Sequence, residues 1–270
     1  MKAFLQFTLV NIHKFLFNSH YRSFLWLLFK YGSKKRYLPL RTNIAGCKFA
    51  LPDAPSFVWQ FKEIFVDESY HFEKVNSAPL IIDCGANVGT SCIWLRQRYP
   101  EARIIAFEAD QGIAKYLEEN ISQNNLDNIT VIKKAVWTHH DGVNFNSEGA
   151  DGGSAINAIE GKHQLVPSID LKDFLIKQDV VDFLKMDIEG AECVVIPHCG
   201  QALKKVKNIF IEYHDYKGKS QHLSQILDTL GSNNFEYWIE SVHHKKSPLM
   251  TQPINGIMYL QLNIFAKQLK

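Results

Sequence analysis

From residue 79 onward the sequence alternates between short apolar runs and stretches with helical spacing. The apolar runs are LIIDC, RIIAFEA, ITVIKKAV, VVDFLKMD and VKNIFIEY, and the expected helices cover 89–98, 111–124, a short stretch after Ser168, 190–202 and 219–230. Near-continuous apolar strands joined by helices are typical of a parallel sheet that is covered on both faces. The alternation therefore predicts an α/β fold.

The last two expected strands, FEYWIE and MYLQLNIF, are separated only by the loop SVHHKKSPLMTQPING. This loop is too short for a helical crossover, so we expect the two strands to pair antiparallel at one edge. The complete prediction is a seven-stranded, mostly parallel sheet with an antiparallel edge strand and helices on both faces. The glycine-rich stretch 146–164 falls between strands. It forms either a loop that covers the functional site, which we favour, or a surface excursion.

The first 52 residues contain nine Lys or Arg and no Asp or Glu, although the net charge of the whole chain is only +2. This basic segment is also aromatic and contains a helical stripe from Leu5 to Leu16 and a second helical stretch from Tyr21 to Gly32. None of its apolar runs reaches the roughly 18–20 residues that a membrane span needs, and it lacks a signal-peptide pattern. We expect a helical extension at 1–46 and one domain at 47–270, which begins with a Pro-punctuated loop and the helix SFVWQFKEIF.

Two interpretations of the extension stay open at this point, and a third is not expected. It packs on the domain as a helical cover, or it lies on an anionic membrane surface through its basic and aromatic side chains. Nucleic acid is not expected, because the remainder of the chain is acidic and has no recognition motif. The five cysteines show no CxxC or Cys/His ligand spacing, which predicts a reduced, cytoplasmic chain without structural zinc, peripheral to the inner face of the membrane if the second interpretation holds.

The stretch IIDCGANVG joins the first strand to its helix and predicts the ligand. Gly85 permits a positive backbone angle, and Gly89 lets the helix begin close to the strand. Glu108 follows the second strand, nineteen residues after Gly89, where an acid accepts hydrogen bonds from a ribose diol. Because Asp83 at the strand end and Asn87 in the turn do not suit a pyrophosphate, a nucleoside with a cationic group fits better than a dinucleotide. S-adenosyl-L-methionine is such a molecule.

The order and spacing of IIDCGANVGTSCIWL, IIAFEADQ, VIKKAVW, DGVNF, SIDLKDFL, VDFLKMDIEGAE and NIFIEYH resemble the FkbM-type methyltransferases. The resemblance covers about residues 57–267, and LKMDIEGAE is its most specific part. It implies a class I, Rossmann-like methyltransferase fold and S-adenosyl-L-methionine as cofactor. The carried-over cofactor-binding residues are Asp83, Gly85, Ala86, Asn87, Gly89, Glu108, Ala109, Ala135 and Asp187. This chain departs from the family after Ala135, where it has VWTHHDG in place of an acid or serine.

Methyl transfer to a hydroxyl needs a base for the departing proton. Asp187, Glu189, Glu212 and His214 follow the fourth and fifth strands and are the catalytic candidates, since paired acids raise one another's pKa. For Glu192 and Glu189, the alternative is a role at the start of the next helix, with Lys185 as a partner for Glu192. No ligand spacing demands a metal, so none is expected.

The resemblance and the basic extension together imply an O-methyltransferase for a sugar hydroxyl in a polysaccharide or glycolipid precursor. Methylation of a small-molecule hydroxyl or carboxylate is the alternative in the same class. From other classes, a NAD-dependent oxidoreductase is disfavoured by the missing third glycine, and a non-catalytic membrane-associated module is disfavoured by the intact cofactor motif. The sequence does not indicate the oligomeric state.

Overall fold

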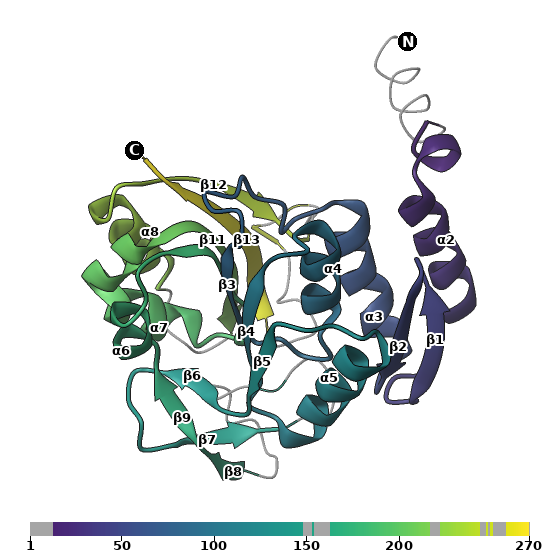
Figure 1. The fold of residues 1–270 in the computed structure, drawn as a ribbon, viewed down its shortest axis with the longest axis horizontal. Helices are drawn as coiled ribbons and strands as arrows, with labels where there is room; N and C mark the ends of the chain where they lie inside the picture. The colour runs from purple at the N-terminus through teal and green to yellow at the C-terminus, as the bar shows by residue number, and fades with distance from the viewer. Residues whose placement is uncertain are drawn as a thin grey trace.

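A seven-stranded sheet in the order β12-β13-β11-β10-β3-β4-β5 forms the centre of the protein (Figure 1). The structure is a computed structural model that describes residues 13–147, 153, 163–216, 222–243, 247, 249–250 and 258–269. The strands, in the order of the sheet, are β12 Phe235–Ser241, β13 Met258–Gln268, β11 Val206–Tyr216, β10 Val181–Met186, β3 Leu80–Cys84, β4 Arg103–Phe107 and β5 Ile129–Ile132.

The predicted parallel core is confirmed, because β11, β10, β3, β4 and β5 pair in parallel. The predicted antiparallel pairing of the last two strands is also confirmed. The strand that runs against the others is β13, which lies one position in from the edge between β12 and β11. The chain therefore folds back from the edge strand β12 and inserts its last strand beside β11.

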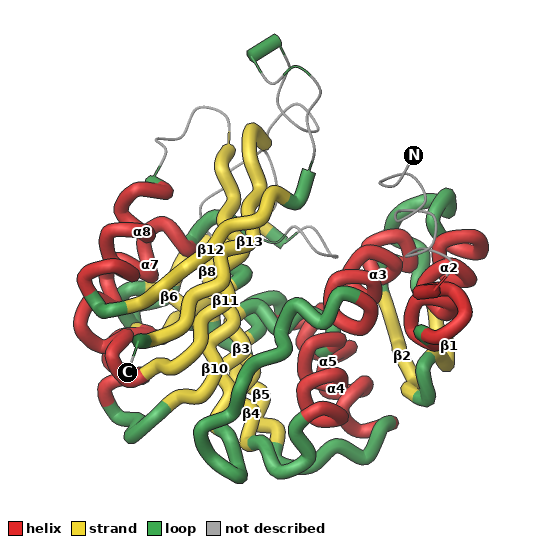
Figure 2. Tube along the Cα trace, turned by 90° about the horizontal axis from the view of Figure 1, so that it is seen from above, coloured by secondary structure: helices red, strands yellow, loops and turns green. Residues whose placement is uncertain are grey.

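Helices cover both faces of the sheet (Figure 2). One face carries α4 Thr90–Arg98 and α5 Gln111–Gln123, and the other carries α6 Leu171–Ile176, α7 Glu192–Cys199 and α8 Leu223–Ser232. The helix predicted at 190–202 is α7 followed by the 3₁₀ helix η2 Gly200–Lys205, and the helix predicted at 219–230 is α8. Successive side chains of a strand point to opposite faces, so Ile81 and Phe183 pack under the first layer, whereas Ile82 and Leu184 pack under the second.

The N-terminal part of the chain adds a third layer outside α4 and α5 (Figure 2). Residues 13–17 are helical, α2 spans Ser19–Tyr31, and α3 Ala54–Phe61 continues into the π-helix η1 Lys62–Val66. Phe24 and Leu27 of α2 are buried in the same core as Phe57 and Phe61 of α3. The described part of the extension therefore packs on the domain through one face of α2, and most of the helical stripe expected from Leu5 to Leu16 lies outside the described residues.

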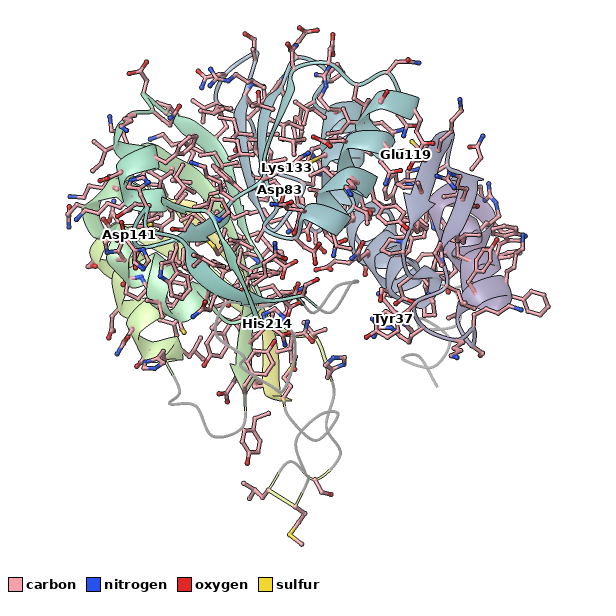
Figure 3. All side chains as sticks on the ribbon, turned by 90° about the horizontal axis from the view of Figure 1, so that it is seen from below. Tyr37, Asp83, Glu119, Lys133, Asp141 and His214 are labelled. Carbon is pink, nitrogen blue, oxygen red and sulfur yellow. The ribbon has the colours of Figure 1, made fainter. Side chains whose placement is uncertain are left out.

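The loop expected from residue 47 is a β-hairpin, formed by β1 Leu40–Ile44 and β2 Cys47–Leu51. The buried carboxamide of Asn120 on α5 holds β2, because it accepts the N–H of Ala50 at 2.6 Å and donates to the carbonyl oxygen of Ala50 at 2.9 Å. Arg41 of β1 adds an exposed ion pair with Glu119 of α5. Glu119 is labelled in Figure 3. The hairpin crosses position 46, where the sequence suggested that the extension ends. Its hydrogen bonds with Asn120 on α5 are a tertiary feature that the local pattern did not predict.

Two small sheets follow β5, where the sequence showed only an irregular stretch. β6 Ala135–Trp137 pairs with β9 Ser168–Asp170, and β7 Val143–Asn146 pairs with β8 His163–Val166. Most of the loop expected to cover the site, at 146–164, lies outside the described residues.

Candidate functional site

The turn after β3 is held between the ends of two neighbouring strands. The N–H groups of Gly85 and Ala86 both donate to the carbonyl oxygen of Phe107 at the end of β4, at 3.0 and 2.9 Å. Gly85 has φ +81°, and a Cβ there would lie 1.8 Å from the backbone oxygen of Asp187 after β10. Only glycine therefore lets the β3 and β10 ends approach this closely.

Two further residues of the turn adopt the left-handed conformation. Gly89 has φ +83°, and a Cβ there would lie 2.5 Å from the Leu117 Cδ1 atom on α5. Asn87 has φ +49°, which the glycine pattern alone did not indicate. The glycine at 89 thus serves the packing of α4 on α5, while Asn87 turns the chain toward Glu108.

Glu108 lies directly after β4 and fastens the turn. Its carboxylate accepts the N–H of Asn87 at 2.9 Å and the N–H of Asp110 at 2.8 Å, and the residue is 8% exposed. Burial raises the pKa of Glu108 to about 7, although these two hydrogen bonds act to lower it. An unshared lone pair on each oxygen stays available to a ligand hydroxyl.

One cavity of about 1070 Å³ collects most of the predicted cofactor residues. They are Gly85, Ala86, Asn87, Glu108, Ala109, Ala135 and Asp187. Pockets for single small molecules measure roughly 300–1,000 Å³. The cavity is therefore large enough for a nucleoside cofactor together with a second small molecule or ring.

Asp83 does not face this cavity as the sequence suggested. It is fully buried beneath the turn, where its Oδ1 atom lies 3.3 Å from the Lys185 ammonium and its Oδ2 atom accepts the hydroxyl of Ser91. Lys185 also donates to the carbonyl oxygen of Gly85 at 2.8 Å and lies 3.3 Å from Asp187 Oδ2. Burial lowers the pKa of Lys185, but Asp83 and Asp187 raise it above its ordinary value. The buried pair holds the β3 and β10 ends together.

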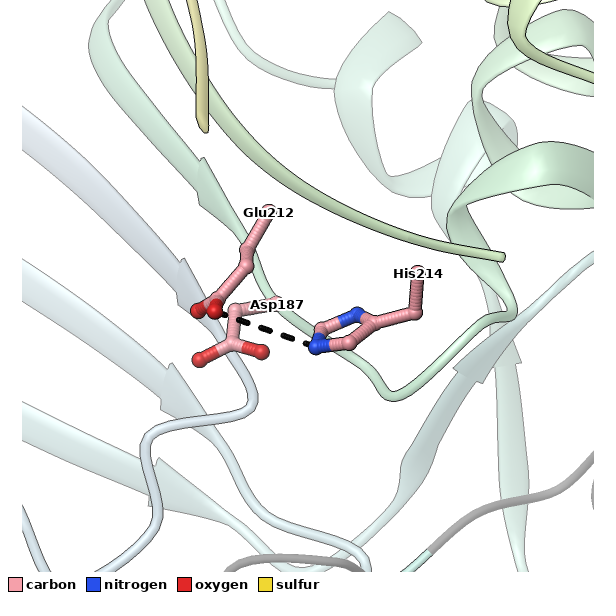
Figure 4. A group of neighbouring side chains, drawn as sticks. All are labelled: Asp187, Glu212 and His214. Carbon is pink, nitrogen blue, oxygen red and sulfur yellow. Dashed lines mark ion pairs between the residues drawn. The ribbon is translucent and has the colours of Figure 1, made fainter. Parts of the chain in front are cut away.

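Asp187, Glu212 and His214 point toward one another at the ends of β10 and β11 (Figure 4). The His214 Nε2 atom lies 3.8 Å from Glu212 Oε1 and 3.8 Å from Glu189 Oε2, and its Nδ1 atom lies 3.6 Å from Glu192 Oε1. Burial lowers the pKa of His214, but these carboxylates raise it well above its ordinary value. The surrounding carboxylates therefore favour the protonated form of this buried imidazole.

The same three side chains are of types that ligate divalent cations, and one potential ligand atom of each lies within 4.8 Å of the others. The sequence offered no ligand spacing here because the three residues come from two strands. The Lys185 ammonium, 3.3 Å from Asp187 Oδ2, opposes a cation at this point.

The remaining acids divide into a structural one and two that line the cavity. Both carboxylate oxygens of Glu192 accept hydrogen bonds from backbone N–H groups, of Ile188 at 2.7 Å and of Gly190 at 2.8 Å. Glu192 therefore stabilises the start of α7, as the alternative expected, but through backbone groups and not through Lys185. Glu189 and Glu212 line the cavity. Burial raises the pKa of Glu189 to about 7 and that of Glu212 well above its ordinary value, and Asp187 adds to both shifts.

Sequence reasoning missed Glu63, which η1 carries into the same cavity. Its Oε1 atom accepts a hydrogen bond from the Asn263 side chain at 3.0 Å, and burial together with Asp187 raises its pKa to about 7. The residue lies twenty positions before Asp83 in a stretch that reads as a plain helix. No sequence signal connects it to β13, because only the tertiary fold brings them together.

Comparisons with known proteins show which family the chain is similar to. Residues 83–237, more than half of the chain, match the family model described as the methyltransferase FkbM domain. A relative from Sinorhizobium fredii, named 2-O-methyltransferase NoeI, is 28% identical over 177 residues, which cover 57% of this chain and 72% of that protein. Methyltransferase 1 of Beauveria bassiana is 23% identical over 197 residues, covering 63% of this chain and 78% of the relative.

Among solved structures, a methyltransferase FkbM from Methylobacillus flagellatus has a TM-score of 0.45 at 19% identity, covering 72% of this chain and 45% of that one. The chain spans 25% of methyltransferase sdnD of Sordaria araneosa and 11% of the AMB antimetabolite synthetase AmbE of Pseudomonas aeruginosa, two further curated relatives.

Proposed function

The chain belongs to the FkbM family of methyltransferases, for which S-adenosyl-L-methionine is the methyl donor, and from this premise we propose that it is an O-methyltransferase. The acceptor in this proposal is a sugar hydroxyl of a polysaccharide or glycolipid precursor. The observation that carries the proposal is the group of acids with raised pKa that lines the cavity beside the cofactor turn.

The residues of the cofactor end fit S-adenosyl-L-methionine. Small side chains at Ala86, Ala109 and Ala135 leave room for a flat base in the cavity, and Glu108 offers carboxylate lone pairs to a ribose diol. Asp187 beside the turn suits the ammonium group of the methionine end. In this proposal the expected binding residues that line the cavity contact one ligand. Asp83 and Gly89 act indirectly, because Asp83 pairs with Lys185 and Gly89 allows α4 to pack on α5.

A hydroxyl acceptor explains why protonatable carboxylates stand near the methyl donor. When bound, S-adenosyl-L-methionine supplies a methyl group activated by a positively charged sulfur. Glu212 orients the acceptor hydroxyl, and Glu189 takes its proton as the new carbon–oxygen bond forms and the carbon–sulfur bond breaks. A carboxyl with a pKa near 7 suits this exchange at neutral pH. His214 holds its place between Glu189 and Glu212 and acts on them through its charge.

The name of the relative 2-O-methyltransferase NoeI supports transfer to oxygen. A carboxylate is the alternative acceptor. It needs no base, and its methylation would give a methyl ester. A hydroxyl acceptor needs a proton acceptor near neutral pH, which Glu189 with its raised pKa supplies, and this favours the hydroxyl.

The test incubates the full chain with tritium-labelled S-adenosyl-L-methionine and a cell-surface glycan fraction. Mild alkali hydrolyses methyl esters but leaves methyl ethers intact, so retention of the label after alkali is the expected result. A Glu189→Gln variant should lose most of the activity while calorimetry shows unchanged cofactor affinity. Complete release of the label by alkali, or label on nitrogen in the product, would refute the O-methyltransferase proposal.

We also propose that the outer face of the N-terminal segment lies on an anionic membrane surface, at the inner face of the membrane. While Phe24 and Leu27 of α2 pack inward, Trp26 is 42% and Phe29 is 92% exposed, and Phe17 before the helix is 75% exposed. Lysines and arginines surround these rings with no acid before Asp53, a combination that favours anionic interfaces. Among the described helices, none is long and apolar enough to span a membrane.

Co-sedimentation with phosphatidylglycerol vesicles tests this surface. The double variant Trp26→Ser, Phe29→Ser should lose most of the binding, and salt should weaken binding of the unaltered chain. Leu165→Ser, which removes an exposed apolar side chain on β8, is the matched control. Equal binding by the double variant and the control would reject the proposal, as would equal binding to neutral phosphatidylcholine vesicles.

A further inference from the structure

Three neighbouring strands present a continuous set of side chains on the sheet face that holds the site. The register places Phe210 of β11, Phe265 of β13 and Trp238 of β12 in one row across the strands. Two residues further along, Glu212, Asn263 and Glu240 form the next row, and His214 and Gln261 begin a third. These residues alternate with core residues of the opposite face, so all of them point to the same side.

Within a row, the exposure of the side chains increases across the sheet from β11 to the edge strand β12. Phe210 is fully buried under Tyr70, with their ring centroids 4.9 Å apart. Phe265 stacks on Trp238 at 6.1 Å with nearly parallel rings, and Trp238 is 52% exposed. Figure 1 shows that the edge formed by β12 and β13 lies away from α4 and α5. The helices therefore cover β3 and β4 but leave this part of the face accessible.

This open face continues into the cofactor cavity. Glu212, Trp238, Glu240, Gln261, Asn263 and Phe265 line the same cavity as the turn after β3. Glu63 of η1 accepts a hydrogen bond from Asn263, so η1 forms part of the cavity wall beside this sheet face. We name this open surface the β12 platform and define it by Trp238, Glu240, Gln261, Asn263 and Glu63.

The chemistry of the β12 platform is that of planar polar groups beside an open aromatic ring. Carboxylates accept hydrogen bonds, and carboxamides both accept and donate them, in the plane of the group, which suits two neighbouring hydroxyls of a ring. The face of Trp238 offers apolar area to the C–H side of a ring. The Oδ1 atom of Asn263 is buried and has no hydrogen-bond partner among the described residues, so a ring hydroxyl would supply the donor that a purely apolar acceptor lacks.

We propose that the β12 platform is the acceptor subsite and that it binds a saccharide ring, with Trp238 under the ring and Glu63, Glu240 and Asn263 on its hydroxyls. This inference rests on the proposed function, because it gives the methyl group an acceptor beside the donor. Glu63, Asn263 and Gln261 lie outside the matched family range 83–237. Acceptor choice in this chain thus depends on segments that flank the family's core.

Saturation-transfer NMR on the full chain provides a test without turnover. The probes are the methyl α-glycosides of glucose, mannose, galactose and fucose, with cyclohexanol as a ring that lacks neighbouring hydroxyls. At least one glycoside should show transfer and cyclohexanol should not. Trp238→Leu should weaken the affinity for that glycoside by about tenfold or more, and Glu240→Gln by a smaller factor.

Matched controls lie on the same strand. Tyr237→Leu removes an exposed aromatic ring from the opposite side of β12, and Glu236→Gln removes an exposed acid that does not line the cavity. Neither control should alter glycoside affinity, and calorimetry should give all four variants the same affinity for S-adenosyl-L-methionine.

The outcomes separate this inference from the proposed function. Absence of binding by all four glycosides, or equal affinity in Trp238→Leu and Tyr237→Leu, overturns the subsite. Alkali-stable methylation of a glycan by a Trp238→Leu variant at the unaltered rate and KM also overturns it, while the O-methyltransferase proposal stands. Glycoside binding that depends on Trp238, in a chain whose product is a methyl ester, supports the subsite and refutes the proposed function.

Discussion

The cofactor end and the β12 platform are built by opposite means. At the cofactor end, consecutive residues of the turn after β3 are locked by backbone hydrogen bonds, a buried ion pair and the carboxylate of Glu108. At the platform, side chains from β11, β12 and β13 meet across strands, and Glu63 arrives from η1, far away in the sequence. The first therefore rests on one short stretch of sequence that two neighbouring strands hold in place, whereas the second is open and assembled from four separate elements.

This difference predicts a separation of effects. Changes at the cofactor end should reduce stability and cofactor affinity, because the same contacts hold the ends of three strands together. Changes at the platform should spare both and alter only the acceptor. The substitutions below test that separation, beginning with the largest expected effect.

Gly85→Ala should be the most damaging change. The new Cβ would stand 1.8 Å from the backbone oxygen of Asp187, so the β3 and β10 ends must part, and we expect a loss above about 4 kcal/mol in the free energy of unfolding. Gly46→Ala is the control, because Gly46 has a similar φ of +76° but open space around it. That control should cost only about 1–2 kcal/mol. Equal losses in urea denaturation would show that the close approach at Gly85 is unimportant.

Lys185→Met should follow in size. It leaves Asp83 buried without its cation, which costs about 3–5 kcal/mol. Adding Asp83→Asn removes the stranded charge and should restore part of the free energy of unfolding. If the double variant is as unstable as the sum of the two single variants, the pair is not coupled as its geometry indicates.

Glu108→Gln should weaken binding of S-adenosyl-L-methionine by roughly 10- to 100-fold, the worth of a hydrogen bond to a charged acceptor. Because the pKa of Glu108 is about 7, the affinity of the unaltered chain should rise as pH increases through 7. The Gln variant should lose that dependence. Calorimetry between pH 5.5 and 8.5 checks it, and a pH slope that persists in the variant would assign the dependence to another group.

The same carboxyl has the opposite effect on the stability of the ligand-free protein. Since its pKa is raised on folding from 4.5 to about 7, the folded state holds the proton more tightly. Its contribution to stability is therefore complete below about pH 4.5 and is lost as pH rises through 7, by at most about 3 kcal/mol. Thermal denaturation of Glu108→Gln should show a flatter decline over this range than the unaltered chain.

Glu240→Gln should have the smallest effect on the folded state. The side chain is exposed on the edge strand, so the free energy of unfolding should change by less than about 0.5 kcal/mol and cofactor affinity should stay the same. A marked loss of either would mean that the platform is coupled to the cofactor end and would weaken the contrast between the two regions.

Local pattern was sufficient for the strands of the central sheet, the helices around the turn and the positions of the glycines at 85 and 89, because apolar periodicity and turn residues can be read along the chain. The close contacts that require those glycines, with Asp187 and Leu117, are tertiary. It was insufficient for Asp83, which the turn placed beside the ligand but which Lys185 draws into the core. It was also insufficient for the hairpin β1–β2, where Asn120 of α5 supplies the partner that makes residues 47–51 a strand.

The sequence by itself determined the parallel sheet, the family and the cofactor, because apolar periodicity and a glycine turn act within a few residues of one another. The tertiary structure alone decided that His214 is buried beside three carboxylates, that η1 brings Glu63 to Asn263, and that β13 inserts beside β11 to create the platform. Those features depend on which strands become neighbours and which charges share one buried space. That information lies in the packed sheet and not in the spacing of residues along the chain.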